Sequence, residues 1–262
     1  MDGFTIDYNS SETITVTDVN IDLATYQAIA NADETTNPLA IEEYLMQTTW
    51  DFTLSDNADI APKGTLIWDG APLELLGDDI VRGQGGNDDL YTVAGSDSLF
   101  GGTGADRLNG GAGKDFLYGG ADNDRLIGGS GNDKQYGGKG NDSLIGGNNN
   151  DRLFGGSGSD ALNGGMGDDR LFGGAGSDVF VFTDNDGDNV IVDFDATDDN
   201  EMLDFSAVLG FFDFGYVSAN FLTQVGTDVV IQDSVISVTL LNTDMSDLDA
   251  NDFIFFELPV IG

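Results

Sequence analysis

Twelve aspartates recur every nine residues in the pattern Gly-Gly-x-x-x-Asp-x-apolar-x. The pattern holds without a slip over residues 101–181, and three looser copies precede it at 74–82, 83–91 and 92–100. A carboxylate at one fixed place in every short repeat indicates a repeated site for hard cations. Counting nonapeptide positions from 1 to 9, position 6 holds Asp79, Asp88, Asp97, Asp106, Asp115, Asp124, Asp133, Asp142, Asp151, Asp160, Asp169 and Asp178.

Stacking the repeats would bring these carboxylates into two columns. Successive coils of such a stack lie about 4.8 Å apart. If each nonapeptide is half a coil, each aspartate lies beside that of the next repeat but one, where the two charges repel unless a divalent cation lies between them. Calcium accepts about six to eight oxygens in flexible geometry, whereas magnesium requires a tighter octahedron. We therefore predict calcium ions, on the order of ten, and folding coupled to their binding. Solvated aspartates in glycine-rich turns are the alternative, which twelve copies in phase disfavour.

The other repeat positions predict how the aspartates are held. Positions 1, 2 and 4 are mostly glycine, which permits tight turns with positive φ and lets carbonyl groups converge. At position 4 the exceptions are Asp122 and Asn149, and both residue types tolerate the left-handed region. Position 8 is apolar in eleven copies and glutamine only at Gln135. Position 8 is therefore the inward position of a very short strand, and the fixed short period predicts an all-β solenoid.

Aromatic residues recur at position 9 once per full coil, every 18 residues, with cations at position 7 on the same side. The members of this stripe are Phe100, Tyr118, Tyr136, Phe154, Phe172, Lys134, Arg152 and Arg170. We expect one face of the solenoid to carry an aromatic ladder edged with cations. Two interpretations stay open. The stripe packs under a terminal region or against another copy, or it is a platform for the sugar rings of an acidic polysaccharide or cell-surface glycan.

Composition excludes several classes of function. Acidic residues outnumber basic ones 47 to 9, giving a net charge of −38, which argues against nucleic acid or an anionic membrane as a partner. The chain has no Cys and no His, so disulfides, a Ser-His-Asp triad and His-ligated zinc are impossible within it. No apolar run approaches the ~18–20 residues that span a bilayer. We expect no enzymatic activity and no membrane span.

The segments outside the repeats predict two caps around a solenoid over residues 74–181. Solenoid ends expose unpaired backbone and need covering. Residues 1–73 predict a small mixed α/β cap of unknown role. Its expected strands lie near 14–17, 50–54 and 65–68, and its expected helices near 22–31 and 39–47.

Residues 182–262 predict an antiparallel β cap at the far end of the solenoid. The acidic run at residues 184–188 suggests one more calcium loop. The expected strands of this cap lie at 190–194, 202–205, 211–217, 228–232, 237–241 and 253–256.

The repeats resemble the RTX, or haemolysin-type calcium-binding, family, most closely over residues 101–181. The tail is similar to the C-terminal region of serralysin-type proteases and family I.3 lipases at residues 178–182, 190–194, 203–206, 226–231 and 248–255. The resemblance implies a right-handed parallel β-roll, with calcium held by the position-6 aspartates and loop carbonyls. It also implies a C-terminal address for the type I secretion machinery of a Gram-negative bacterium.

Taken together, these features predict a secreted, extracellular calcium-binding protein that folds outside the cell and presents a β-roll surface. The first residues are neither basic nor strongly apolar and predict no N-terminal signal peptide. The family's enzymes do not carry over, because a His-Glu-x-x-His motif is impossible and Gly-x-Ser-x-Gly is absent. Two alternatives stay open. The chain is a non-catalytic tail of a secreted protease, lipase or alginate-modifying enzyme, or it is a scaffold that self-assembles through its aromatic face.

Overall fold

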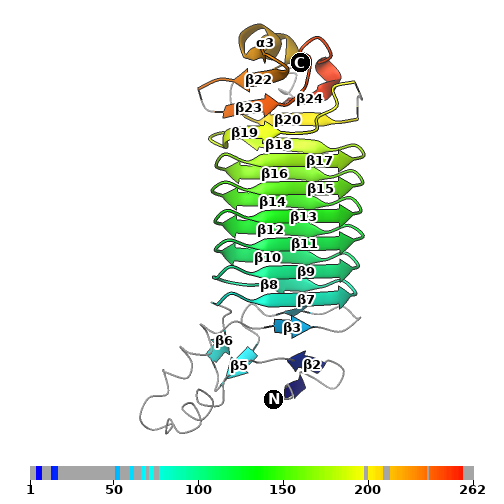
Figure 1. Cartoon of the computed structure of the whole chain (residues 1–262), viewed down its shortest axis with the longest axis vertical. Coiled ribbons are helices and arrows are strands. Elements are labelled where there is room, and N and C mark those ends of the chain that lie inside the picture. The colour runs from blue at the N-terminus through cyan, green and yellow to red at the C-terminus, as the bar shows by residue number, and fades with distance from the viewer. Residues whose placement is uncertain are drawn as a thin grey trace, which may run out of the picture.

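The computed structural model describes most of the chain from residue 77 onward and six short strands before it. The described residues are 4–7, 13–16, 51–53, 60–61, 66–68, 71–73, 77–197, 200–208, 213–234 and 236–255. Within these ranges the strands stack into a parallel β-solenoid, with further strands added to its two sheets at each end (Figure 1). The predicted all-β class is confirmed.

Successive strands of the roll alternate between two facing sheets. In order along the chain they are β7 (Ile80–Gly85), β8 (Asp89–Tyr91), β9 (Ser98–Thr103), β10 (Arg107–Ala112), β11 (Phe116–Ala121), β12 (Arg125–Ser130), β13 (Lys134–Lys139), β14 (Ser143–Asn148), β15 (Arg152–Ser157), β16 (Ala161–Met166), β17 (Arg170–Ala175) and β18 (Val179–Thr183). Odd-numbered strands lie in one sheet and even-numbered strands in the other. Neighbours are parallel and 18 residues apart, as where Leu108 pairs with Leu126. Each nonapeptide is therefore half a coil, as predicted.

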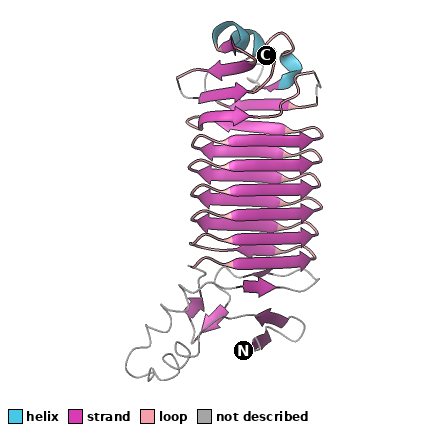
Figure 2. Ribbon diagram, viewed as in Figure 1, coloured by secondary structure: helices cyan, strands magenta, loops and turns pink. Residues whose placement is uncertain are grey.

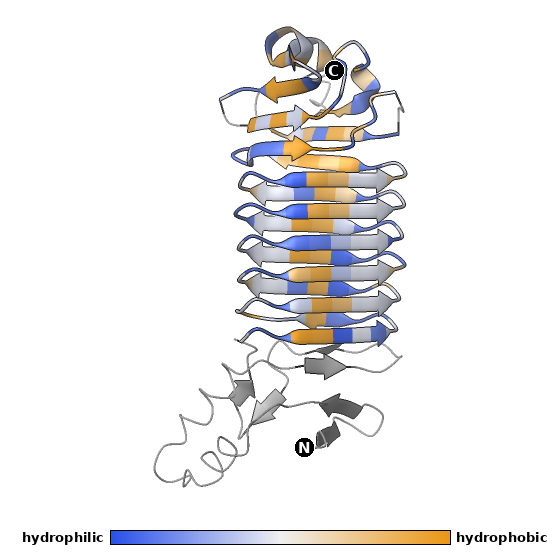
Figure 3. Ribbon diagram, viewed as in Figure 1, coloured by the Kyte–Doolittle hydropathy of each residue, from blue (hydrophilic) through white to orange (hydrophobic). Residues whose placement is uncertain are grey.

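The core is a double column of position-8 side chains between the two sheets. The nine leucines, one valine and one phenylalanine among them are at most 1 % exposed. In most roll strands burial alternates from residue to residue, because successive strand side chains point to opposite faces. Each fully buried leucine stabilises the fold by about 1.5–3 kcal/mol. This column crosses the middle of most roll strands as an apolar band (Figure 3). Gln135 is fully buried within the same column.

Strands before residue 74 extend both sheets beyond the first coil. β3 (Asp51–Thr53) pairs in parallel with β7, and β4 (Ile60–Ala61) pairs in parallel with β8. The hairpin of β1 (Phe4–Asp7) and β2 (Thr13–Val16) continues from β3, while β5 (Leu66–Trp68) pairs with β6 (Ala71–Leu73). The three strands predicted in this segment are confirmed as β2, β3 and β5. The helices predicted at 22–31 and 39–47 lie outside the described residues.

The far end of the roll is closed by both parallel and antiparallel strands (Figure 2). The antiparallel part is the set β21 to β23, and β19 joins that set to β17 of the roll. On the other sheet β20 and β24 continue the parallel stack after β18. The bounds are β19 (Gly187–Ile191), β20 (Met202–Ala207), β21 (Leu222–Val225), β22 (Asp228–Gln232), β23 (Ile236–Leu240) and β24 (Phe253–Ile254), with a short 3-10 helix η1 (Ala250–Asp252) before β24.

One predicted strand of this cap is wrong. The sequence suggested a strand over 211–217, but residues 214–217 begin the helix α3 (Phe214–Asn220). The carboxylate of Asp213 accepts a hydrogen bond of 2.8 Å from the backbone N–H of Tyr216 and so caps the first turn. Val217 is the buried residue of the helix.

Candidate metal centre

All twelve position-6 aspartates are buried, with at most 3 % of each residue exposed. From Asp97 onward, each carboxylate accepts through Oδ1 the backbone N–H of the aspartate 18 residues earlier. The ten hydrogen bonds of this kind in the described part of the chain measure 2.7–2.9 Å. The carboxylates therefore form two columns, one from Asp79 to Asp169 and one from Asp88 to Asp178.

The second oxygen of these carboxylates is left without a donor. In the ten aspartates from Asp97 to Asp178, Oδ2 is buried and has no hydrogen-bond partner among the described residues. A buried charge without a partner is strongly unfavourable, so a partner of opposite charge is needed. An oxygen atom of this kind is what calcium binds.

Loop carbonyl oxygens lie close to the same unpartnered oxygens. A Cβ atom added to Gly101, at position 1, would overlap Asp106 Oδ2 and lie 2.7 Å from the carbonyl oxygen of Gly119 in the next coil. No three Asp, Glu, His or Cys side chains gather into a metal site anywhere in the described ranges. The remaining ligands of each ion would therefore be carbonyl groups of the loops, and the residues present fit calcium.

Burial changes the acidity of these carboxyl groups. It raises the pKa of Asp115, Asp160 and Asp169 to about 7, and that of Asp124 and Asp151 to about 8. The backbone N–H bonds lower these pKa values in part. For Asp115, Asp124, Asp151 and Asp160, neighbouring carboxylates of the column raise the pKa further, in line with the repulsion expected from the sequence. A cation beside Oδ2 would favour the ionised form.

The turns require glycine because successive coils approach closely. Gly113, at position 4, has φ +141°, and a Cβ there would run into the carbonyl group of Gly95 one coil earlier. Asp122 and Asn149 take φ 77° at the same repeat position. The predicted left-handed conformation of these two residues is therefore confirmed.

A second ladder of side chains, at position 5, was not predicted. Asn87 Oδ1 accepts the N–H of Ala105 at 2.9 Å, and Asn141 Oδ1 accepts the N–H of Ser159 at 2.9 Å. These bonds run opposite in direction to those of position 6 and lie on the exposed side of the loops. The sequence could have predicted this ladder, since seven of the twelve residues at position 5 are Asn or Asp.

The two columns end differently in the C-terminal cap. The N–H of Asp169 donates to Oδ1 of Asn189 at 3.1 Å, so a neutral amide takes the place of the next carboxylate. In the other column Met202 N–H bonds to the Asp178 carbonyl, which places Glu201 after Asp178. Burial raises the pKa of Glu201 to about 7. The extra calcium loop predicted at 184–188 stays a prediction; its buried Asp186 accepts the N–H of Thr183 within its own turn.

The predicted aromatic ladder forms on the outer face of the odd-numbered strands. Tyr136 and Phe154 stack with ring centroids 4.6 Å apart, and Phe154 and Phe172 stack at 4.4 Å. Lys134 Nζ lies 4.9 Å from the Tyr136 ring centroid. The strand register places Lys134, Arg152 and Arg170 in one row.

The first half of the ladder is looser and includes a ring that the sequence pattern missed. Tyr118 is 41 % exposed, and its ring lies 6.4 Å from that of Tyr136. Phe116, at position 7, lies 5.8 Å from Phe100 and 5.6 Å from Tyr136. It therefore bridges rings that the position-9 pattern left separate.

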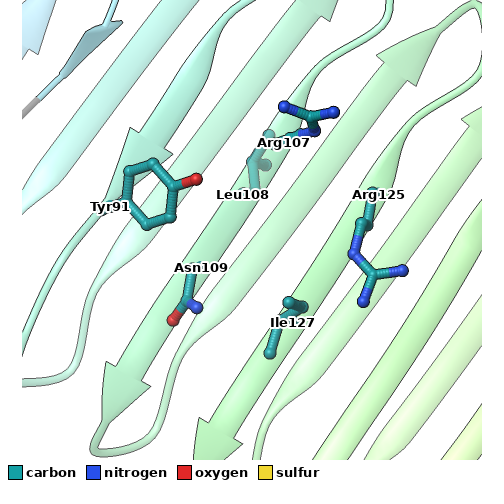
Figure 4. Close-up of a pocket in the computed structure, with 6 residues that line it drawn as sticks. All are labelled: Tyr91, Arg107, Leu108, Asn109, Arg125 and Ile127. Carbon is teal, nitrogen blue, oxygen red and sulfur yellow. The ribbon is translucent and has the colours of Figure 1, made fainter.

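The opposite face of the roll carries a shallow hollow over β8, β10 and β12 (Figure 4). Its lining residues are Tyr91, Arg107, Leu108, Asn109, Arg125 and Ile127. Arg107 is exposed and lies 3.6 Å from Asp89. This hollow holds two cations and an aromatic ring but no acid, base or nucleophile set for catalysis.

The chain matches the family of RTX calcium-binding nonapeptide repeats (4 copies) at residues 75–99, 100–135, 127–162 and 145–180. Residues 75–180 belong to this RTX repeat family. The predicted family is therefore confirmed, and the strand pairing described above confirms the predicted parallel β-roll. Over the described ranges of the RTX chain, no helix is long and apolar enough to cross a membrane.

Solved structures similar to this RTX chain include two repeat subunits of the mannuronan C5-epimerase of Azotobacter vinelandii. AlgE6R2 is 31 % identical, with 51 % of this chain and 94 % of that one covered and a TM-score of 0.40. AlgE6R3 is 26 % identical, with coverages of 57 % and 88 % and a TM-score of 0.35. The extracellular lipase LipA of Serratia marcescens is 17 % identical, with 79 % of this chain but 42 % of the lipase covered and a TM-score of 0.34. No curated protein matches the chain.

Proposed function

We propose that the roll binds calcium ions between the loops of adjacent coils and that binding completes its folding. The observation that carries this proposal is the row of buried Oδ2 atoms without a hydrogen-bond donor. Ten pairs of loops are joined by an Asp–Asp hydrogen bond, so the number of ions is on the order of ten.

Different groups of the chain have different roles in such a site. From Asp97 to Asp178, Oδ1 of each position-6 aspartate accepts the backbone N–H of the preceding loop, and Oδ2 and the loop carbonyls are left to face the ion. Calcium would supply the positive charge that lets the buried carboxylates ionise together. The position-1, -2 and -4 glycines keep the loops close enough for carbonyls of two coils to contribute.

Far-UV circular dichroism on decalcified protein tests this proposal. We expect little β-structure without calcium and a cooperative gain when calcium is added, because the sites do not exist in the unfolded chain. Isothermal titration calorimetry should then count on the order of ten ions. A decalcified chain that is already fully β-rich and does not respond to calcium would disprove the proposal.

We propose further that the protein is non-catalytic and extracellular, exported by a type I secretion machinery and folded outside the cell. Its RTX calcium-binding repeats support this proposal. A non-catalytic tail of a secreted enzyme is the alternative. Export can be compared for the whole chain and for a chain lacking residues 182–262 in a Gram-negative host with a type I exporter. Only the whole chain should reach the medium, and equal export of both would contradict the assignment of the signal.

We propose as a second function that the aromatic ladder binds a polysaccharide, with an acidic one favoured by the adjacent cations. Its support is the stacked row of Tyr136, Phe154 and Phe172 beside Lys134, Arg152 and Arg170. Flat rings offer stacking surfaces to sugars, and cations attract carboxylates.

A glycan array with calcium present tests the ladder. The double variant Tyr136→Ala, Phe154→Ala should lose binding while keeping calcium-induced folding. The matched control is Ile127→Ala, Ile145→Ala, at the same repeat position on the opposite sheet, which should keep binding. Unchanged binding by the ladder variant would exclude the platform. Light scattering against calcium concentration would then show whether the same face joins copies of the chain.

A further inference from the structure

Thr92 places a side chain at a repeat position that is otherwise glycine. From residue 83 to residue 181, position 1 is glycine in every copy of the repeat except that of Thr92. Thr92 is buried, and its hydroxyl oxygen Oγ1 donates a hydrogen bond of 2.7 Å to the carbonyl oxygen of Gly110, one coil further along the chain. The inside of this loop therefore holds a hydroxyl group and a methyl group that the other loops lack.

Position 1 is crowded by the oxygen atoms of the candidate calcium loops. At each of the nine glycines from Gly101 to Gly173, an added Cβ would overlap Oδ2 of the position-6 aspartate in the same repeat. At Gly137 the added Cβ would also lie 2.6 Å from the carbonyl oxygen of Gly155, which is position 1 of the next coil. The carboxylate Oδ2 and the carbonyl of the next coil therefore converge beside every one of these glycines, and both are oxygens of the kind that calcium binds.

In the Thr92 repeat, the threonine side chain lies at the corresponding pair of groups. These groups are the carboxyl group of Asp97 and the carbonyl group of Gly110. The Thr92 hydroxyl donates to the carbonyl, and it also lies beside the carboxyl group. Burial raises the pKa of Asp97 to about 6, and the Asp79 N–H and the Thr92 hydroxyl lower it in part. The carbonyl that would face an ion thus already has a hydrogen-bond donor.

The backbone of this loop is held in the same way as that of the other loops. The N–H of Asp97 donates a hydrogen bond of 2.9 Å to Oδ1 of Asp115, as in the rest of the column. Gly95, at position 4, has φ +128°, within the range of the other position-4 glycines. The Thr92 loop therefore differs from its neighbours in its position-1 side chain and not in how it is joined to the next coil.

We propose that Thr92 closes this loop pair to calcium, with its hydroxyl taking the place of the ion as the partner of the Gly110 carbonyl. This inference rests on the proposed binding of calcium by the loops. A hydroxyl satisfies one carbonyl with its single hydrogen and needs no further ligands, whereas calcium must gather about six to eight oxygens. The pair formed by the Asp97 and Gly110 loops thus stays without an ion when the equivalent pairs of the following repeats are filled.

Native mass spectrometry of the full chain in saturating calcium counts the bound ions one by one and tests this proposal. Thr92→Gly removes the side chain, so we expect this variant to bind one ion more than the unaltered chain. Thr92→Ser keeps the hydroxyl and should bind the same number as the unaltered chain. Thr103→Gly, the same exchange at an exposed position 3, is the matched control and should also leave the count unchanged. Circular dichroism confirms that each variant is folded.

A second variant tests the hydroxyl separately from the space that it fills. Thr92→Val keeps the shape of the side chain but removes the donor to the Gly110 carbonyl. It should gain no ion, and it should unfold at a lower temperature than the unaltered chain in saturating calcium, because a buried carbonyl loses its partner. An unchanged unfolding midpoint would overturn the assigned role of the hydroxyl.

The ion counts also separate this inference from the proposal on which it rests. Unaltered protein that binds no calcium would remove both. Unaltered protein that binds calcium, with Thr92→Gly binding the same number of ions or fewer, would overturn the role of Thr92 alone.

Discussion

The backbone N–H of Asp133 donates a hydrogen bond of 2.7 Å to Oδ1 of Asp151, one coil further along the chain. From Asp97 to Asp178, each position-6 carboxylate therefore holds the loop before it and still keeps Oδ2 for a cation. These hydrogen bonds all run from one loop to the next coil toward the C-terminus. The backbone N–H groups of the last loops therefore need acceptors from residues that follow the repeats. Asn189 provides one of these acceptors to Asp169. The C-terminal cap thus completes the hydrogen bonding of the repeat loops as well as covering the open end of the roll.

Substitutions of Asp151 should separate the two roles of the carboxylate. Asp151→Asn keeps an acceptor for Asp133 N–H but removes the charge, so we expect lost or weakened calcium binding. Asp151→Ala also removes the acceptor and should be less stable than Asp151→Asn by about 1–2 kcal/mol at saturating calcium. Calorimetry and thermal unfolding measure the two effects. Asp89→Asn, outside the loop at position 7, is the control; equal calcium stoichiometry in Asp151→Asn and the unaltered chain would contradict the assignment.

Acid should partly replace calcium in stabilising the roll. Burial raises the pKa of Asp97 to about 6, of Asp115 to about 7 and of Asp124 to about 8 in the folded, metal-free state. The folded chain therefore holds more protons than the unfolded chain between about pH 4 and about pH 8. Its free energy of unfolding is greatest at the acid end of that interval and falls as the pH rises through these pKa values.

Far-UV circular dichroism of the decalcified protein at about pH 5 and at about pH 8 tests this dependence. We expect more β-structure at the lower pH. With calcium present, the apparent affinity should instead rise over the same interval, since the ion and the protons compete for the same carboxylates. Greater stability of the decalcified chain at the alkaline end would show that the carboxylates are not buried as described.

A methyl group at a position-4 glycine should force neighbouring coils apart. Gly113→Ala places a Cβ against the Gly95 carbonyl and puts alanine at φ +141°. We expect a loss of at least about 2 kcal/mol in the free energy of unfolding, together with weaker calcium binding. Urea unfolding in saturating calcium gives the measurement. Ala112→Ser, exposed in the adjoining turn position, should change little; similar effects of the two variants would argue against close packing of the loops.

The stacked half of the aromatic ladder should contribute to stability independently of any ligand. Phe154 stacks on both Tyr136 and Phe172, so Phe154→Ala removes two ring contacts and should cost about 1–3 kcal/mol. Tyr118→Ala is the matched comparison, because its ring is 41 % exposed and 6.4 Å from Tyr136, and it should cost less. Thermal unfolding in saturating calcium shows which of the two variants loses more stability. A larger loss for Tyr118→Ala would place the main packing contacts elsewhere.

The sequence by itself determined the repeat unit, the inward column and the two columns of aspartates. These features follow from a nine-residue period in which turn-forming glycines, a carboxylate and one apolar residue keep the same phase. Because half a coil is one period, side chains 18 residues apart must lie side by side. The same reasoning anticipated the aromatic ladder and the left-handed turns at Asp122 and Asn149.

Only the tertiary structure decided how the two oxygens of each carboxylate are used, since that depends on where the backbone N–H of the preceding coil lies. It also decided that Phe116 joins the ladder and that Gln135 reaches across to Ile145 beside the Asp133 loop. These contacts join atoms from different coils or different sheets, and no local pattern encodes their distances. The helix α3 shows the same limit. Its apolar residues suited a strand or a helix equally, and the Asp213 cap with the burial of Val217 selected the helix.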